Sequence, residues 1–368
     1  MKAATLAVQR PRDARLLVVD GTGRIAHHAR SSLADLLRPG DLVVANDAAT
    51  LPASLAGTHV PSGATIEVRL AGRRAIDDDA TTFIAVVFGA GDFRTRTEDR
   101  PMPPALQAGD ALALGPLVAT IVRRIDHPRL VELCFTGDAD AVRAGIARHG
   151  RPVQYAHLAA PLDLWDVWTR IAAEPVAFEA PSAGFVLDWR LLDRLAERGI
   201  GFATLTHAAG LSSTGDAALD ARMPFDEPYR LPSSTVAAIV DARRRGRRIV
   251  ALGTTVARAL EHAAAQPGGL RAGHGLATNR LGATSRLAVV DVLISGTHEP
   301  GSSHRELLRA FADDATLARI DATLESSDYR THEFGDSVLI EPSLQPRSNL
   351  KTATLASKFG NERTTLPA

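Results

Sequence analysis

The sequence is poor in cysteine and in long hydrophobic runs. Its 368 residues include one cysteine, Cys134, which has no partner for a disulfide bond within the chain. No apolar run approaches the roughly 20 residues that a membrane-spanning helix needs. The amino-terminal segment MKAATLAVQRPRDA also has no apolar stretch of the length found in signal peptides. We therefore expect a cytoplasmic protein that has no membrane segment.

The chain also has no net charge that would attract a polyanion. Lysine plus arginine and aspartate plus glutamate number 42 each, so a nucleic-acid partner would have to bind a local basic patch. The arginine run in DARRRGRRIV (residues 241–250) is one such patch, but arginines at a helix end also interact favourably with the helix dipole. With one cysteine and only loosely spaced histidines, such as His298 and His304, we expect no metal site.

The length and the change of pattern along the chain predict two domains. A chain of 368 residues exceeds the usual size of a single domain. From about residue 55 to 150, short apolar runs alternate with turn residues, which is typical of an antiparallel barrel or sandwich. Beyond residue 170, strand-like and helix-like segments alternate, which favours a parallel-rich α/β sheet. We therefore expect residues 1–55 and 151–342 to form one α/β domain, residues 56–150 to form an inserted β domain, and residues 343–368 to form a flexible tail.

One junction between a predicted strand and a predicted helix has the character of a ligand site. In RRIVALGTTVARALEHA (residues 247–263), Gly253, Thr254 and Thr255 separate an apolar strand from a helix. Such turns lie at the carboxyl edge of parallel sheets, where α/β proteins bind ligands, although plain helix capping explains the same residues. The segment lacks the lysine of a phosphate-binding loop. Arg258 and Glu261 lie three residues apart on this helix, a spacing that also allows a simple surface pair.

Three other strand ends carry polar loops. VVDVLISGTHEPGSSHRELL (residues 289–308) places His298 and Ser302 before a helix whose amino end suits a carboxylate. TLTHAAGLSSTGD (residues 204–216) places His207 after a strand, and EFGDSVLI (residues 333–340) places Asp336 before the last one. Asp336 is either a turn residue or a ligand contact.

Six of these segments, in this order, resemble one enzyme family. The segments are RLLVVD, LRPGDLVVAND, APSAGF, GTTVARALE, VVDVLISGTHEPGSS and YRTHEFGDSVLI. They are similar to the S-adenosylmethionine:tRNA ribosyltransferase-isomerases of the queuosine pathway, from about residue 14 to 341. The resemblance implies an α/β domain with a parallel-rich sheet, interrupted by an inserted antiparallel β-barrel domain. It also implies transfer and isomerisation of the ribosyl group of S-adenosylmethionine onto 7-aminomethyl-7-deazaguanine in tRNA, giving epoxyqueuosine, adenine and methionine.

The implied reaction needs a base and a site for the methionine part of the co-substrate. The sulfonium acidifies the hydrogens at C5′, so a nearby carboxylate or histidine can remove one. S-adenosylmethionine is a co-substrate, and the resemblance implies neither a cofactor nor a metal. At positions matching the family, the candidate bases are Glu261, Glu227, His298 and His207. The candidate binding residues are Gly253, Thr254, Thr255, Arg258, Ser302 and Asp336.

The chain departs from the family at positions suited to phosphates or to a purine-like base. Two arginines of the family are replaced by Ala49 and Ser54, two histidines by Val186 and Phe225, and a lysine by Gly301. These losses predict weakened binding of tRNA. Two alternatives therefore stay open: a paralogue that uses S-adenosylmethionine with an acceptor other than tRNA, and a non-catalytic nucleoside-binding protein.

Overall fold

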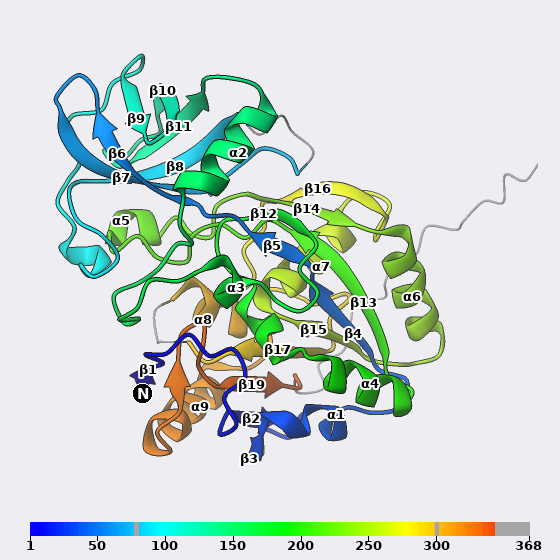
Figure 1. The fold of residues 1–368 in the computed structure, drawn as a ribbon. Helices are drawn as coiled ribbons and strands as arrows, with labels where there is room; N and C mark the ends of the chain where they lie inside the picture. The colour runs from blue at the N-terminus through cyan, green and yellow to red at the C-terminus, as the bar shows by residue number, and fades with distance from the viewer. Residues whose placement is uncertain (77–80, 299–301, 343–368) are drawn as a thin grey trace, which may run out of the picture.

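The chain forms a large mixed sheet with helices on both faces and a separate closed β-barrel (Figure 1). The computed structural model describes residues 1–76, 81–298 and 302–342, and the expected tail at 343–368 lies outside the described residues. In the view of Figure 1 the barrel lies above the sheet, and α5 (Ala217–Asp220) lies close beneath it.

The large sheet has nine strands in the order β16-β14-β13-β4-β15-β17-β19-β2-β3. The pairs β13–β4, β4–β15, β15–β17 and β19–β2 are parallel, and the other four pairs are antiparallel. The strands span β2 (Arg15–Val19), β3 (Ile25–Ala29), β4 (Leu42–Asn46), β13 (Gly201–His207), β14 (Glu227–Leu231), β15 (Ile249–Leu252), β16 (Gly273–Ala277), β17 (Val292–Gly296) and β19 (Ser337–Ile340).

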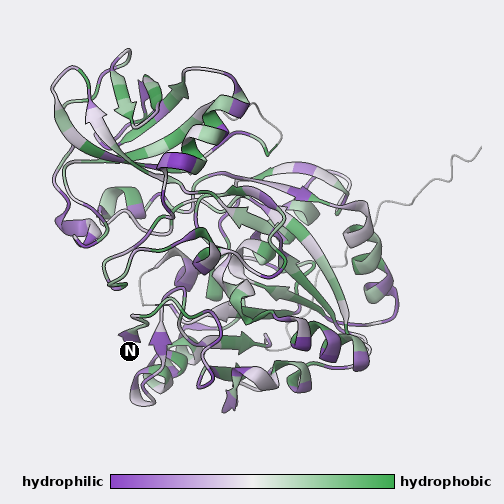
Figure 2. Cartoon of the chain, in the orientation of Figure 1, coloured by the Kyte–Doolittle hydropathy of each residue, from purple (hydrophilic) through white to green (hydrophobic). Residues whose placement is uncertain are grey.

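Successive side chains along each strand point to opposite faces of the sheet, so the sheet contributes to two hydrophobic cores, one on each face. Leu17 and Val44 face a core shared with α6, α7 and α9, whereas their neighbours Leu16 and Val43 face a core shared with α1 and α4. Figure 2 shows the hydrophobic residues concentrated along the strands. The helices span α1 (Leu33–Leu36), α4 (Trp189–Glu197), α6 (Ser233–Arg244), α7 (Thr254–Ala265), α8 (Ser303–Leu308) and α9 (Asp314–Ser326).

The barrel closes through six antiparallel strands in the order β10-β11-β8-β7-β6-β9. They span β6 (Ser54–His59), β7 (Ala64–Gly72), β8 (Thr82–Phe88), β9 (Ala111–Leu114), β10 (Leu117–Arg124) and β11 (Leu130–Phe135). Helix α2 (Ala139–His149) packs on the barrel through Val142 and Ile146. Leu211, Leu219 and Met223 also belong to the barrel core, although they follow β13 of the sheet. The segment from Leu211 to Met223 therefore connects the two parts of the molecule.

The remaining elements are short. They are β1 (Lys2–Ala3), which pairs with β18 (Arg330–Thr331), β5 (Ala48–Thr50), which pairs with β12 (Glu174–Ala177), α3 (Leu164–Val167), and the 3-10 turns Arg30–Ser32, Thr97–Asp99 and Ser182–Val186. Within the described part of the chain, no helix combines the length and the apolar character needed to cross a membrane.

The predicted fold class, an α/β sheet interrupted by an antiparallel barrel, is confirmed. The sheet is less uniformly parallel than the alternation of strands and helices suggests, because half of its strand pairs are antiparallel. One of these pairs is the hairpin of β2 and β3, whose strands are joined by a direct turn around Gly23 with φ 80°. A short connection cannot bring the next strand back in the parallel sense.

Candidate active site

The junction at Gly253 lies at the carboxyl edge of the sheet, between β15 and α7. Gly253 has φ 111° and ψ 148°, a conformation that side chains other than glycine's rarely adopt. Its N–H donates to the carbonyl of Ile294 on the neighbouring strand at 2.8 Å. Glycine has no side chain, so no side-chain hydrogen bond caps the amino end of α7 at Gly253. The next two residues, Thr254 and Thr255, form the first turn of α7 and line cavities. The sequence predicted a ligand site at this junction.

A cavity of about 600 Å³ lies beside this edge, bordered by α5, α8 and the loop that precedes β19. Its polar lining consists of carboxylates, imidazoles and hydroxyls. The residues are Glu179, Ser182, Ser212, Ser213, Asp220, Thr297, His298, Ser302, His304, His332 and Glu333. Alanines complete the lining, so none of the described residues around this cavity is a lysine or an arginine.

Two stacked histidines form one wall of the cavity. The rings of His298 and His304 lie 4.5 Å apart with an interplanar angle of 8°. The Nε2 atom of His298 lies 3.0 Å from the hydroxyl oxygen of Ser295. Burial, followed by the neighbouring histidines, lowers the pKa of His298 well below its ordinary range, and burial also lowers the pKa of His304. Both rings are therefore neutral at physiological pH.

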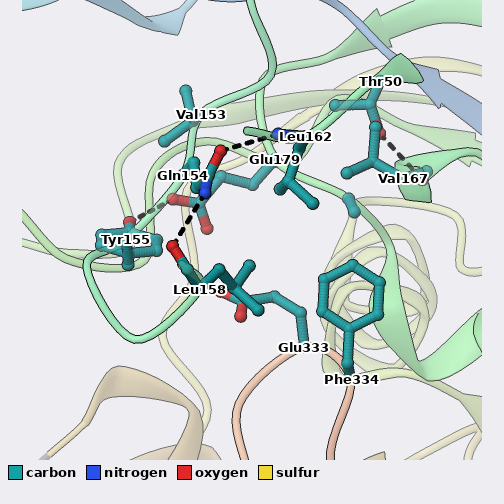
Figure 3. Close-up of a pocket in the computed structure, with 11 residues that line it drawn as sticks. Thr50, Val153, Gln154, Tyr155, Leu158, Leu162, Val167, Glu179, Glu333 and Phe334 are labelled. Atoms are coloured by element: carbon teal, nitrogen blue, oxygen red, sulfur yellow. Dashed lines mark hydrogen bonds between the residues drawn. The ribbon is translucent and has the colours of Figure 1, made fainter. Parts of the chain in front are cut away.

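Glu179 is a half-buried carboxylate that lines the same cavity. The hydroxyl of Tyr155 donates to its Oε1 atom, as the dashed line in Figure 3 shows, and Tyr155 also lies 3.3 Å from the hydroxyl of Ser212. Burial raises the pKa of Glu179 to about 7, while the hydrogen bonds from Tyr155 and Ser212 act in the opposite direction. A carboxyl group with this pKa exchanges its proton readily near neutral pH.

Glu333 is the second carboxylate of this cavity. Its Oε2 atom lies 3.1 Å from Nε2 of His157, and the rings of His157 and His332 stack at 4.2 Å. Burial disfavours the charged carboxylate, but the hydrogen bond and the charge of His157 outweigh it, so the pKa of Glu333 is lowered. Glu333 therefore holds a negative charge beside Glu179.

His157, His332 and Glu333 also form a candidate metal cluster, because their ligand atoms lie within 4.8 Å of one another. A metal requires lone pairs that converge on one point. The lone pairs of an imidazole lie in the plane of its ring, and the rings of His157 and His332 are nearly parallel, at 19°. They face each other as a stack rather than converge, so the residues present fit a metal poorly.

Glu227 and Arg258 form a buried pair that lines a smaller cavity of about 70 Å³. Glu227 also accepts a hydrogen bond from the backbone N–H of Gly210 at 2.6 Å, and Arg258 donates to the carbonyls of Phe225, Ala277 and Asn279 at 2.7–2.9 Å. Burial raises the pKa of Glu227 despite the opposing effect of Arg258. With these partners, Arg258 acts as a brace between α7 and the strands.

His207 lies at the end of β13, fully buried against this pair. Its Nε2 atom is 3.4 Å from a carboxylate oxygen of Glu227, but neither ring nitrogen has a hydrogen-bond partner among the described residues. Burial, and then the charge of Arg258, lower the pKa of His207 to about 3. Since Arg258 already neutralises Glu227, His207 remains neutral and the contact is not an ion pair.

Two residues that the sequence placed at the site lie elsewhere. The Glu261 carboxylate accepts hydrogen bonds from the backbone N–H groups of Ala288, Val289 and Val290 at 2.7, 2.9 and 2.8 Å. Asp336 accepts from the backbone N–H groups of Arg15 and Arg330 at 2.7 and 2.9 Å. Neither carboxylate lines the cavities described above, and each holds a loop in place. Of the two interpretations of Asp336, this geometry supports the turn.

Seven of the predicted site residues line the three neighbouring cavities. They are Glu227, Gly253, Thr254, Thr255, Arg258, His298 and Ser302. Ser302 also caps α8, accepting from the N–H of Arg305 at 3.1 Å. Sequence reasoning missed most of the titratable lining. These residues are Tyr155, Glu179, His304, His332 and Glu333. His304, His332 and Glu333 lie inside the segments 289–308 and 329–340, so a count of the titratable residues in these two segments finds them.

At the positions where this chain departs from the family, the described residues pack in the interior or form hydrogen bonds within the protein. Ala49 is buried in β5, Ser54 donates to Glu67 at 2.7 Å, and Val186 packs in the core beside α4. Phe225 packs at the barrel core through its side chain. Gly301 lies outside the described residues.

Several arginines of the run at 243–248 have internal partners. Arg243 pairs with Asp291 at 3.0 Å, Arg245 with Asp241 at 3.1 Å, and Arg248 with Asp41 at 2.5 Å. This favours the helix-end interpretation of the run over a phosphate-binding patch.

The fold and the site together define a two-part α/β protein with a ligand cavity at the carboxyl edge of its sheet. Residues 2–340 match the family model described as "Queuosine biosynthesis protein", and the chain belongs to this family. The S-adenosylmethionine:tRNA ribosyltransferase-isomerase of Pelobacter propionicus is 32% identical over 87% of this chain and 90% of its own length. The enzyme of the same name from Gloeobacter violaceus is 34% identical over 90% of each chain.

A crystal structure of S-adenosylmethionine tRNA ribosyltransferase from Thermotoga maritima also resembles this chain. It is 23% identical and has a TM-score of 0.47, and the match covers 92% of this chain and 95% of that one.

Proposed function

We propose that this protein transfers and isomerises the ribosyl group of S-adenosylmethionine onto 7-aminomethyl-7-deazaguanine in tRNA, and that it acts in the cytoplasm. The products are epoxyqueuosine in the tRNA, adenine and methionine. The observation that carries the proposal is the family match over residues 2–340, together with relatives of 32% and 34% identity that bear the name of this activity. S-adenosylmethionine is a co-substrate, and we expect no further cofactor.

The cavity offers what the reaction requires. A pocket of about 600 Å³ can take a nucleoside together with part of an acceptor. The amino end of α7, at Thr254 and Thr255, suits the carboxylate of the methionine part, because the first N–H groups of a helix attract anions. Thr254 and Thr255 line the cavity that also contains Gly253 and His298.

Among the four candidate bases from the sequence, His298 is best placed to act at C5′. It lines the large cavity, and its neutral imidazole has a lone pair that can accept a proton. Glu227 is engaged by Arg258 and Gly210, and Glu261 by three backbone amides. His207 lies behind Glu227 rather than in the lining of the large cavity.

The proposal is tested by incubating the protein with S-adenosylmethionine, with and without tRNA that carries the aminomethyl base. Adenine and methionine are then followed by chromatography. Release that requires the modified tRNA supports the proposal, whereas release without tRNA indicates a paralogue with another acceptor. Binding of S-adenosylmethionine without release indicates a non-catalytic nucleoside-binding protein.

A variant pair tests the base. We expect His298→Gln to lower the rate of adenine release by about 10²–10⁴-fold, the usual contribution of a general base. His28→Gln, on the edge strand β3 and outside the cavities, is the matched control and should retain the parent rate. Equal rates for His298→Gln and the parent would show that His298 is not the base at C5′ and that another residue of the cavity lining acts there.

A further inference from the structure

We propose that Glu179 and Glu333 form a cation site that binds the primary ammonium group of the acceptor, with Glu179 as the residue that takes its proton. This inference rests on the proposed function, because it specifies the acceptor end of the same cavity. It adds a recognition site and a catalytic role for residues that the sequence motifs do not single out.

The first argument is the charge of the cavity. Glu179, Glu333 and Asp220 line it, and no lysine or arginine stands among its described lining residues. Asp220 is engaged by the N–H of Thr214 at 2.7 Å and by the hydroxyl of Ser213 at 3.1 Å. Glu179 and Glu333 each have a side-chain partner, Tyr155 and His157 respectively, and both carboxylates also line the cavity. A lining of this charge repels phosphate and attracts a cation.

The second argument is the arrangement of the two carboxylates. They come from different segments and line both the large cavity and the small one of about 20 Å³ drawn in Figure 3. Each is held from one side by a neighbour: Tyr155 donates to Glu179, and His157 lies 3.1 Å from Glu333. The negative charge of Glu333 also disfavours ionisation of Glu179. A cation bound between them relieves this repulsion.

The chemical step is a proton transfer. An alkylammonium group is no nucleophile until it loses a proton, and a carboxylate with a pKa near neutrality is suited to receive it. One N–H bond of the ammonium breaks and an O–H bond forms on Glu179. The electron pair that is freed on nitrogen makes the amine a nucleophile for the ribosyl transfer, and no other bond forms or breaks in this proton-transfer step. Glu333 keeps its charge and orients the ammonium before the transfer.

The charged and titratable groups around Glu179 set its behaviour. Tyr155 contacts it directly, Glu333 lies across the cavity, and Arg69 of β7 interacts with both Tyr155 and Glu179. Removing the Tyr155 hydroxyl takes away a donor to the carboxylate. We therefore expect Tyr155→Phe to move the acidic limb of the pH–rate profile to higher pH.

The binding test uses calorimetry with S-adenosylmethionine present. The probes are 7-aminomethyl-7-deazaguanine and its uncharged 7-hydroxymethyl analogue. We expect the parent protein to prefer the amine by at least about tenfold, and Glu179→Gln and Glu333→Gln to lose this preference. Glu132→Gln removes a buried carboxylate of the barrel that is paired with Arg74 and Arg123, and this matched control should keep it.

Binding of both probes equally, or of neither, by the parent protein would overturn the proposal. A loss of affinity for S-adenosylmethionine in both variants, with the amine preference intact, would also overturn it, because the bound cation would then belong to the co-substrate. This test needs no turnover, so it fails or succeeds independently of the proposed reaction. Melting curves of the variants establish that they are folded.

The kinetic test follows methionine release with the modified tRNA. Glu179→Gln should lower it by about 10²–10⁴-fold with little change in the affinity for S-adenosylmethionine. Unchanged turnover would remove Glu179 as the proton acceptor. Failure of the parent protein to release methionine, combined with a clear amine preference in calorimetry, would overturn the proposed function and leave the cation site in place.

Discussion

Two regions of the molecule each withdraw a glutamate from solvent, Glu261 fully and Glu179 in part, and they give the two carboxylates opposite surroundings. On the outer half of α7, the Glu261 carboxylate accepts hydrogen bonds from three consecutive backbone N–H groups, at 2.7–2.9 Å. At the large cavity, Glu179 receives hydroxyl donors, lies near the charge of Glu333 and has its pKa raised to about 7. A carboxylate saturated by the backbone stabilises a loop, whereas one that faces a cavity with a mobile proton is available for chemistry.

The same contrast holds for the histidines. His207 is buried without a hydrogen-bond partner among the described residues and lies against a pair that is already neutralised. His298 is half-buried and also neutral, but its ring lines the large cavity and stacks on His304. Burial and a shifted pKa are therefore not sufficient to identify a catalytic group. Access to the cavity distinguishes the two.

The largest expected effect is on stability, at Glu261. Glu261→Gln replaces an acceptor oxygen by an NH₂ group and leaves buried N–H donors unsatisfied, which we expect to lower the free energy of unfolding by roughly 3–5 kcal/mol. The rate per folded molecule should be unchanged, because the residue lies outside the cavity lining. Urea denaturation and active-site-normalised kinetics measure both. A Glu261→Gln variant as stable as the parent would show that Glu261 does not stabilise the loop. A folded variant with a lowered rate would show that Glu261, like Glu179, takes part in the reaction.

The next effect is a pH dependence at Glu179. Its pKa is raised from 4.5 to about 7 in the folded protein, so the protonated form is favoured by folding. This contribution is complete below about pH 4.5 and is lost as the pH rises through about 7, which amounts to about 3 kcal/mol. Because glutamine does not titrate, the stability of Glu179→Gln relative to the parent should increase by this amount over the same range.

Denaturation of the two proteins side by side at several pH values checks this expectation. His207 contributes with the opposite sign, because its pKa is lowered from 6.5 to about 3 and its contribution is lost as the pH falls through that range. That contribution is present in both proteins and cancels in the difference. A difference that stays constant with pH would show that Glu179 is charged at neutrality.

The smallest expected effect concerns metal. Dialysis against a chelator should leave adenine release unchanged, and metal analysis should find no stoichiometric ion, because His157 and His332 stack and Glu333 is already paired with His157. Addition of zinc, manganese or nickel after dialysis is the matching experiment. Activity that disappears on dialysis and returns with one of these ions would assign the cluster to a metal and would change the role of Glu333.

Much of the fold could be predicted because its signals are local. The hairpin of β2 and β3 follows from a turn sequence between two apolar runs, and the barrel follows from short alternating strands separated by glycines. The antiparallel partners within the large sheet could not be predicted in the same way. The order of strands depends on which strands pair in the tertiary structure, and the residues of a strand do not identify the strand that it pairs with.

The site divides along the same line. The sequence by itself determined the junction at Gly253, because positive φ demands glycine and the helix must begin at Thr254, and its motifs identified the family. Only the tertiary structure decided that Tyr155 meets Glu179, 24 residues away, and that His157 meets Glu333, 176 residues away. It also decided that Glu261, although inside the most family-specific motif, is held by backbone amides away from the cavity. Local conformation depends on neighbouring residues, so the sequence pattern reveals it. The environment that sets the pKa of a carboxylate is built from segments far apart in the chain, and hydrophobic periodicity does not show which of these segments lie in contact.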